Sequence, residues 1–210
     1  MNRMDAHNTV EERVRDALRY RSELPNIEFK RGASFSDLQY HIAKTAQAIA
    51  NLRDGGLIIV GVAQTDKEYA LEGVTPEHEA SYQVEAVYDF VNSYASPSME
   101  LRVLTVDFEG NRFVAVAIPP FERLPIVCRK NTPSGAAREM RAGEVYVRTG
   151  APVGTTKVTS AAMMEELLQR ASAFRAAETL RILRSGGVQM ESLVPPDPLQ
   201  KEVEDLADLL

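Results

Sequence analysis

Residues 51–62 read NLRDGGLIIVGV, and this stretch decides how the chain folds. Apolar residues before it, such as Ile42, Ala46 and Ile49, recur at helical spacing, and a glycine pair is typical of the end of a helix. The run Leu57–Val62 is apolar apart from Gly61, as expected of a strand buried on both faces of a sheet. The stretch therefore predicts a helix that leads into the central strand.

Further strands are predicted on both sides of this centre. Asn26–Arg31 alternates apolar and charged residues, which is typical of a strand with one buried face. Glu100–Phe108 and Arg112–Ile118 are joined by a sequence typical of a tight hairpin turn, and Glu144–Arg148 is the last predicted strand. With helices between these strands, the pattern predicts an α/β (α+β) fold with a mixed, largely antiparallel sheet flanked by helices.

Length and composition indicate one domain with a short addition. The chain has 210 residues, of which 44% are hydrophobic, and we expect a disordered N-terminus over residues 1–8 and a domain over 9–185. Residues 186–210 contain a proline-rich linker and an acidic terminal helix with an apolar side. Cys128 is the single cysteine, which excludes an internal disulfide and favours a reducing compartment. Without an apolar segment of about 20 residues, a soluble cytoplasmic protein is expected.

The charge is distributed unevenly along the chain. The net charge is -6, but the segment from Gln189 onward carries six acidic residues against Lys201 alone. Basic residues dominate another segment, namely Arg123, Arg129, Lys130, Arg138, Arg141 and Arg148. Such a segment is either a local phosphate-binding patch on an acidic protein or a solvated loop rich in arginine.

Several common site signatures are absent. The sequence has no G-x-x-x-x-G-K-[ST] phosphate loop, no G-x-G-x-x-G and no nucleophile elbow. The histidines His7, His41 and His78 are scattered, and His41, beside apolar positions of a predicted helix, is interpreted as a satisfied or solvated side chain.

An acidic pair remains as the candidate site. Glu23 lies at the end of the first predicted helix, and Glu28 projects from the next strand beside Lys30. Carboxylates at the mouth of a sheet can hold Mg²⁺ or Mn²⁺ and support phosphodiester cleavage, with a lysine stabilising the transition state. The simpler alternative is an exposed pair of Glu28 with Lys30 and a solvated Glu23.

The motifs together resemble the Schlafen AlbA-like domain. The resemblance rests on E-x-x-x-x-E-F-K from Glu23 to Lys30 and on A-I-A-N-x-x-x-G-G-x-I-x-V-G-V over residues 48–62. Ile118-Pro119 with Pro125, and Y-V-R-x-G over residues 146–150, continue it in order. It covers about residues 20–170.

The resemblance implies a mixed α/β domain that associates with nucleic acid. In animal Schlafen proteins the fold includes endoribonucleases that act on structured RNA such as tRNA through three acids, two of which are similar in position to Glu23 and Glu28. Where the family often has two aspartates after Gly-Val, this chain has Ala63-Gln64, and Asp66 is the nearest acid. The animal enzymes build a cleft from two related lobes, so the resemblance also implies that this single lobe forms a homodimer.

These observations predict a nucleic-acid-binding protein in a bacterial regulatory or defence setting, with RNA favoured over DNA. Metal-dependent endoribonuclease activity is one prediction of the resemblance. The predicted catalytic residues are Glu23, Glu28 and Lys30, and the predicted ligands of Mg²⁺ or Mn²⁺ are Glu23, Glu28 and Asp66, with Gln64 as an alternative third group. The predicted phosphate contacts are Lys30, Arg31, Arg129, Lys130, Arg138, Arg141 and Arg148.

Two alternative functions remain open. One is an inactive interaction module that assembles with a protein partner through residues 195–210. The other is ATP binding, which the missing phosphate loop disfavours.

Overall fold

The computed structural model describes residues 3–65 and 68–185. Its helices are α1 (Arg3–Tyr20), α2 (Phe35–Ala50), α3 (Pro76–Ala80), α4 (Val84–Ser93) and α5 (Ala161–Ser185). Its strands are β1 (Ile27–Lys30), β2 (Gly56–Val60), β3 (Val62–Gln64), β4 (Tyr69–Leu71), β5 (Ala95–Ser96), β6 (Arg102–Phe108), β7 (Asn111–Ile118), β8 (Val127–Cys128), β9 (Tyr146–Gly150) and β10 (Val153–Lys157).

The main sheet has four strands in the order β1-β2-β7-β6. The β1 and β2 strands run parallel, with Ile27 opposite Leu57, whereas β2 pairs with β7 and β7 with β6 in antiparallel fashion. Three two-stranded pairs surround the main sheet, namely β3 with β4, β9 with β10, and β5 with β8. The predicted class, an α+β fold with a mixed and mostly antiparallel sheet, is confirmed.

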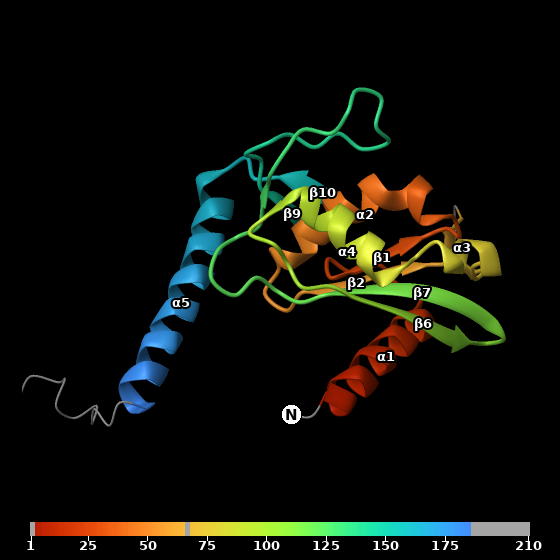
Figure 1. Ribbon diagram of the computed structural model, residues 1–210, viewed down its shortest axis with the longest axis horizontal. Helices are drawn as coiled ribbons and strands as arrows, with labels where there is room; N and C mark the ends of the chain where they lie inside the picture. The colour runs from red at the N-terminus through yellow and green to blue at the C-terminus, as the bar shows by residue number, and fades with distance from the viewer. Residues whose placement is uncertain (1–2, 66–67, 186–210) are drawn as a thin grey trace, which may run out of the picture. The chain divides into compact units, whose positions relative to one another are not determined.

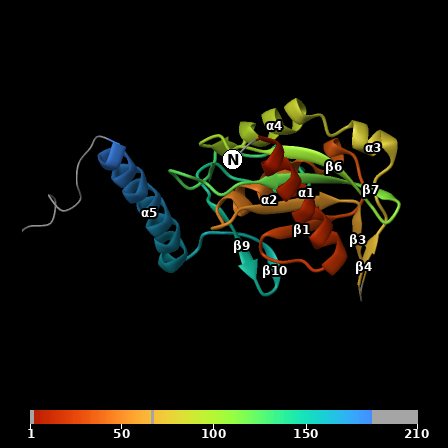
Figure 2. The ribbon, with the colours of Figure 1, turned by 90° about the horizontal axis from the view of Figure 1, so that it is seen from below.

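Helices cover both faces of this sheet. Figures 1 and 2 show α1 against one face and α2 with α4 against the other. The side chains of β2 alternate accordingly: Leu57 and Ile59 pack in the cluster that contains Leu18 of α1, while Ile58 and Val60 pack in the cluster that contains Ile42 of α2. Every residue of β2 is buried, as the apolar run predicted.

Two glycines in the opening stretch are required by their surroundings. Gly55 has φ of +62°, and a Cβ atom there would lie 2.2 Å from the carbonyl oxygen of Ile118. Gly61 has φ of +113°, and a Cβ atom would lie 2.9 Å from the backbone of Gly73. Because only glycine tolerates both the conformation and the close approach, the chain can enter β2 tightly and leave it in a new direction toward β3.

The β9–β10 hairpin packs against α2 and completes one end of the domain. This second strand was not predicted, because residues 153–157 are mostly small and polar and show no apolar alternation. At the N-terminus, α1 begins at Arg3, so residues 3–8 are helical rather than disordered. Ala, Met and Arg in this segment favour helix even though no apolar stripe marks it.

The chain divides into two compact units, Met1–Ala171 and Ser172–Leu210. In the second unit, the structure describes the remainder of α5 as far as Ser185. The predicted linker, acidic helix and partner-binding segment 195–210 lie outside the described residues, as does Asp66. None of the helices in residues 3–65 and 68–185 is long and apolar enough to cross a membrane.

Candidate functional site

A polar pocket of about 290 Å³ lies where β1, α2, β3 and the β9–β10 hairpin meet. The three residues predicted to be catalytic, Glu23, Glu28 and Lys30, all line it. Its remaining charged or titratable lining residues are His41, Lys44, Arg138 and Arg148. Side chains separated by more than 120 positions in the sequence therefore share one small space, as predicted for the acids and the lysine.

Glu28 is the most heavily engaged acid of the pocket. Its Oε1 pairs with the Lys30 ammonium, and its Oε2 lies 2.6 Å from Nη2 of Arg148. Burial by itself raises the pKa of Glu28, but the combined attraction of Lys30 and Arg148 outweighs it and holds the pKa below its ordinary value. Glu28 is therefore a carboxylate held between two cations, which differs from the alternative of an exposed surface pair.

Arg148 is buried, with only 1% of its side chain exposed. Besides Glu28, its Nε donates to the carbonyl oxygen of Pro25 at 2.9 Å and its Nη1 donates to Thr155 Oγ1 at 3.0 Å. Thr155 is the residue directly opposite Arg148 in the β9–β10 pair. Nε and Nη1 are therefore hydrogen-bonded, and Nη2 makes the ion pair with Glu28, so these contacts hold Arg148 beside Glu28. Its contact with phosphate stays a prediction.

Glu23 links the end of the first helix to the β1 strand. Its Oε1 accepts a hydrogen bond from the backbone N–H of Phe29 at 2.9 Å. Tyr69 lies beside it, and burial together with the Glu23 carboxylate raises the pKa of the Tyr69 phenol. Glu23 is thereby fixed at the same pocket as Glu28, although the two acids belong to different elements.

The donor set does not fit a divalent cation as it stands. Both oxygens of Glu28 are taken by cations, and one oxygen of Glu23 accepts from a backbone amide. Gln64 lines the pocket at the place where the sequence suggested a third ligand, but its amide is a weaker donor than a carboxylate. Within residues 3–65 and 68–185, no three His, Cys, Asp or Glu side chains are grouped so as to hold a metal ion.

Two residues of α2 that sequence reasoning did not select belong to the pocket, namely His41 and Lys44. Arg138 donates through Nε to His41 Nδ1 at 3.1 Å, so His41 is a partly exposed side chain with a hydrogen-bond partner, as interpreted from the sequence. Lys44 lies over the Tyr146 ring at 4.7 Å and donates to the carbonyl oxygen of Glu139 at 2.8 Å. Because they are three positions apart, His41 and Lys44 lie on one face of α2, and this spacing is the feature of the sequence that could have identified them.

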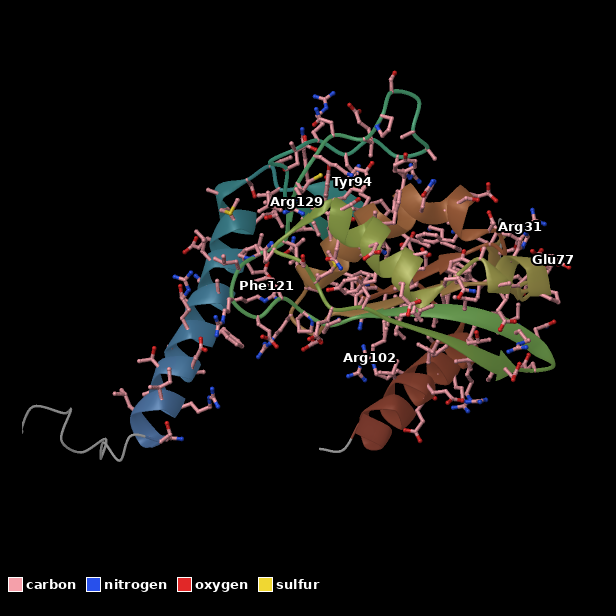
Figure 3. All side chains as sticks on the ribbon, in the orientation of Figure 1. Arg31, Glu77, Tyr94, Arg102, Phe121 and Arg129 are labelled. Atoms are coloured by element: carbon pink, nitrogen blue, oxygen red, sulfur yellow. The ribbon has the colours of Figure 1, made fainter. Side chains whose placement is uncertain are left out.

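The other predicted phosphate-binding residues lie outside the pocket. Arg31 pairs with Glu72 at 3.0 Å, and Arg141 pairs with Glu139 at 2.8 Å. Lys130 lies 4.4 Å from the Tyr94 ring centre, and Arg129 follows β8. Figure 3 shows Arg129 beside Tyr94 and far from Arg31, so these cations form separate groups on the surface.

Comparison with known proteins identifies the family. A family model described as Schlafen, AlbA_2 matches residues 23–156, whereas no curated protein matches the chain. Among solved structures, the DIP2311 protein from Corynebacterium diphtheriae matches with a TM-score of 0.51 and 13% identity, over 80% of this chain and 29% of that one. The N-terminal domain of a putative ATP-dependent DNA helicase RecG-related protein from Nitrosomonas europaea has a TM-score of 0.40 and 24% identity, over 61% of this chain and 85% of that one.

The structural similarity to the DIP2311 protein shows a shared fold alone, and this chain spans less than a third of that protein's length. The family match is more informative, because it covers more than half of the chain. It begins at Glu23 and ends at Thr156, and so includes the acids, Lys30, the β9 strand with Arg148 and all of β10 except Lys157. The chain belongs to the Schlafen AlbA_2 family.

Proposed function

We propose that this protein binds nucleic acid, with RNA favoured over DNA, and that the pocket receives a phosphate group of the strand. The observation that carries the proposal is the convergence of Lys30, Lys44, Arg138 and Arg148 on one pocket that also holds Glu23 and Glu28. Lysine and arginine contacts to phosphate supply most of the affinity of sequence-independent binding. The resemblance to Schlafen domains supports the preference for RNA.

The proposed contacts follow from exposure and pairing. Lys44 and Arg138 face the pocket without pairing with Glu28 and would contact phosphate directly. Lys30 would reach phosphate from its ion pair with Glu28, whereas the more buried Arg148 would hold Glu28 in place. Outside the pocket, Arg129, Lys130, Arg31 and Arg141 would contact phosphates further along the strand. Figure 3 shows Arg31 and Arg129 in different regions of the molecule, so these two side chains would contact different phosphates of a bound strand.

Binding to mixed tRNA is expected to weaken as salt rises. For three phosphate contacts, the affinity should fall about 40-fold or more between about 50 and about 300 mM salt, because bound counterions are released on association. Lys44→Gln and Lys130→Gln should each weaken binding and reduce the salt dependence. Fluorescence anisotropy with labelled tRNA measures the affinity and its dependence on salt concentration.

Arg102→Gln is the matched control for these variants. Arg102 is an exposed arginine of β6 and does not line the pocket, so its loss removes one positive charge without touching the proposed site. Affinity that is the same at both salt concentrations, or that falls equally in Arg102→Gln and Lys44→Gln, would contradict the proposal.

We propose RNA cleavage in the same pocket as a second function, because Glu23, Glu28 and Lys30 all line it. The two carboxylates would serve as acid and base, and Lys30 would stabilise the charge that develops on phosphate. Mixed tRNA incubated with the parent protein should be cleaved, and Glu28→Gln should abolish cleavage while binding remains.

Parallel incubations with Mn²⁺, Mg²⁺ and a chelator test the metal predicted from the sequence. Cleavage that needs Mn²⁺ or Mg²⁺ would mean that a cation displaces Lys30 from Glu28, whereas cleavage in the chelator would show that the ion-paired arrangement is the active one. Equal cleavage by the parent and Glu28→Gln would attribute the activity to a contaminant.

A further inference from the structure

The α2 side of the pocket carries a second group of polar side chains that the acid pair does not use. Arg138 donates to His41 Nδ1 at 3.1 Å, so that nitrogen is an acceptor and the proton of the neutral imidazole resides on Nε2. Burial, Arg138 and Lys30 lower the pKa of His41, which keeps the ring neutral at physiological pH. Imidazole Nε2 is thereby left as a hydrogen-bond donor.

Thr155 contributes a similar donor from the β9–β10 hairpin. Its Oγ1 accepts a hydrogen bond from Arg148 Nη1 at 3.0 Å, so its hydroxyl proton is available for another partner. Both Thr155 and His41 line the pocket together with Lys44. The pocket therefore has hydrogen-bond donors from α2 and from the β9–β10 hairpin, in addition to its charged side chains.

The charges that line the pocket do not cancel. Four cations, Lys30, Lys44, Arg138 and Arg148, face two carboxylates, which leaves a net charge of +2 when His41 is neutral. Glu28 is compensated by its own two cations, and Glu23 accepts from the Phe29 amide. Burial lowers the pKa of Lys44, and the attraction of Glu144 and Glu139, which raises the pKa, only partly offsets this effect.

On the basis of the proposed nucleic-acid binding, we propose that the pocket takes a terminal phosphate monoester of a strand in preference to an internal phosphodiester. A monoester carries a charge of roughly -1.5 to -2 near neutral pH, which balances the net charge of the pocket. An internal diester carries a single negative charge and would leave part of the pocket's charge unbalanced. The volume of about 290 Å³ is at the small end for ligand pockets, which suits a strand end and not a continuous duplex. Lys44, Arg138, His41 and Thr155 would donate to its oxygens.

Three labelled single-stranded RNAs of identical sequence test this proposal: one with a 5′ phosphate, one with a 3′ phosphate, and one with hydroxyl groups at both ends. One phosphorylated RNA should bind about tenfold tighter or more than the hydroxyl RNA, because charge-assisted hydrogen bonds of this kind discriminate by at least that factor. Which of the two binds tighter identifies the end that the pocket accepts.

Variants of the protein then test whether the preference for a phosphorylated end arises from the pocket. Lys44→Gln and Arg138→Gln should each remove the preference for the phosphorylated end. The Arg138 side chain is on an exposed loop, so its replacement leaves the core unchanged. Arg102→Gln should keep the preference in full. Loss of the preference in Arg102→Gln as well would overturn the assignment to the pocket.

The outcomes separate this inference from the proposed function. Equal binding of all three RNAs, with strong salt dependence, would overturn the terminal-phosphate proposal and leave nucleic-acid binding in place. If no RNA bound at any salt concentration, the proposed function itself would be contradicted.

Discussion

Replacing Arg148 by methionine is expected to lower the free energy of unfolding by roughly 3–5 kcal/mol, the usual cost of removing one partner of a buried ion pair. The large effect follows from burial: 1% of the Arg148 side chain and 12% of the Glu28 side chain are exposed. The variant also leaves the carbonyl oxygen of Pro25 without its hydrogen-bond donor. Chemical denaturation measures the change.

Two comparisons make this prediction specific. Arg141→Met breaks an exposed pair with Glu139 and should cost less than about 1 kcal/mol. Adding Glu28→Gln to Arg148→Met should recover part of the lost stability, because the buried charge that lacks compensation is removed. If Arg148→Met and Arg141→Met had equal stability, Arg148 would not have the positioning role assigned to it.

The stability difference between the parent and Arg148→Met should also depend on pH. Because Arg148 and Lys30 hold the pKa of Glu28 below its ordinary value, the ion pair stabilises the folded parent at pH values above that ordinary value. This contribution is lost as the pH falls through the lowered pKa and Glu28 becomes protonated. The difference should therefore be largest near neutral pH and shrink in acid, and a difference that grows in acid would contradict the ion-pair explanation.

Replacing Asn51 by alanine is expected to have an effect of similar or larger size. Asn51 is 3% exposed, and its side chain accepts from the backbone N–H of Ile126 and donates to the carbonyl oxygens of Ile126 and Tyr146, at 2.8–2.9 Å. Each buried backbone group left without a partner costs about 1–3 kcal/mol, so the total is roughly 3 kcal/mol or more. Since the free energy of unfolding of a domain is about 5–15 kcal/mol in total, the variant would lose a large part of its stability.

Asn111→Ala provides the matched comparison, because within the described part of the chain the Asn111 side chain donates one hydrogen bond, to the carbonyl oxygen of Leu71, at a partly buried position. It should cost about a third as much as Asn51→Ala, and thermal denaturation of both variants gives the ratio. Equal costs would mean that Asn51 does not join α2 to the segments that contain Ile126 and Tyr146.

The fold was predictable because local patterns identify its main elements. The glycine pair and the apolar run of residues 55–60 define β2, and the alternation in residues 27–30 defines β1. The β6–β7 hairpin also follows from the composition of its turn. In contrast, β10 has no apolar alternation, and its position becomes clear only from its pairing with β9.

The site was predictable only in part. Glu23, Glu28 and Lys30 are close in sequence and in space. The spacing of His41 and Lys44 places them on one face of α2, but only the packing of α2 in the fold brings that face to the acids. A signal for the burial of Arg148 did exist, because Arg148 is two positions after Tyr146 and therefore shares its buried strand face. Arg148 was predicted to contact phosphate from its charge alone, without regard to this burial.

The most direct test of the central claim, that this pocket binds nucleic-acid phosphate, is an NMR titration of the protein with a short RNA. The amide signals of Lys30, Lys44 and Thr155 should shift together and saturate at one concentration. A more apolar pocket of about 380 Å³, lined by Phe121 and Leu124, serves as the internal comparison and should not respond. Shifts at Phe121 and Leu124 with none at Lys30, Lys44 and Thr155 would contradict the claim.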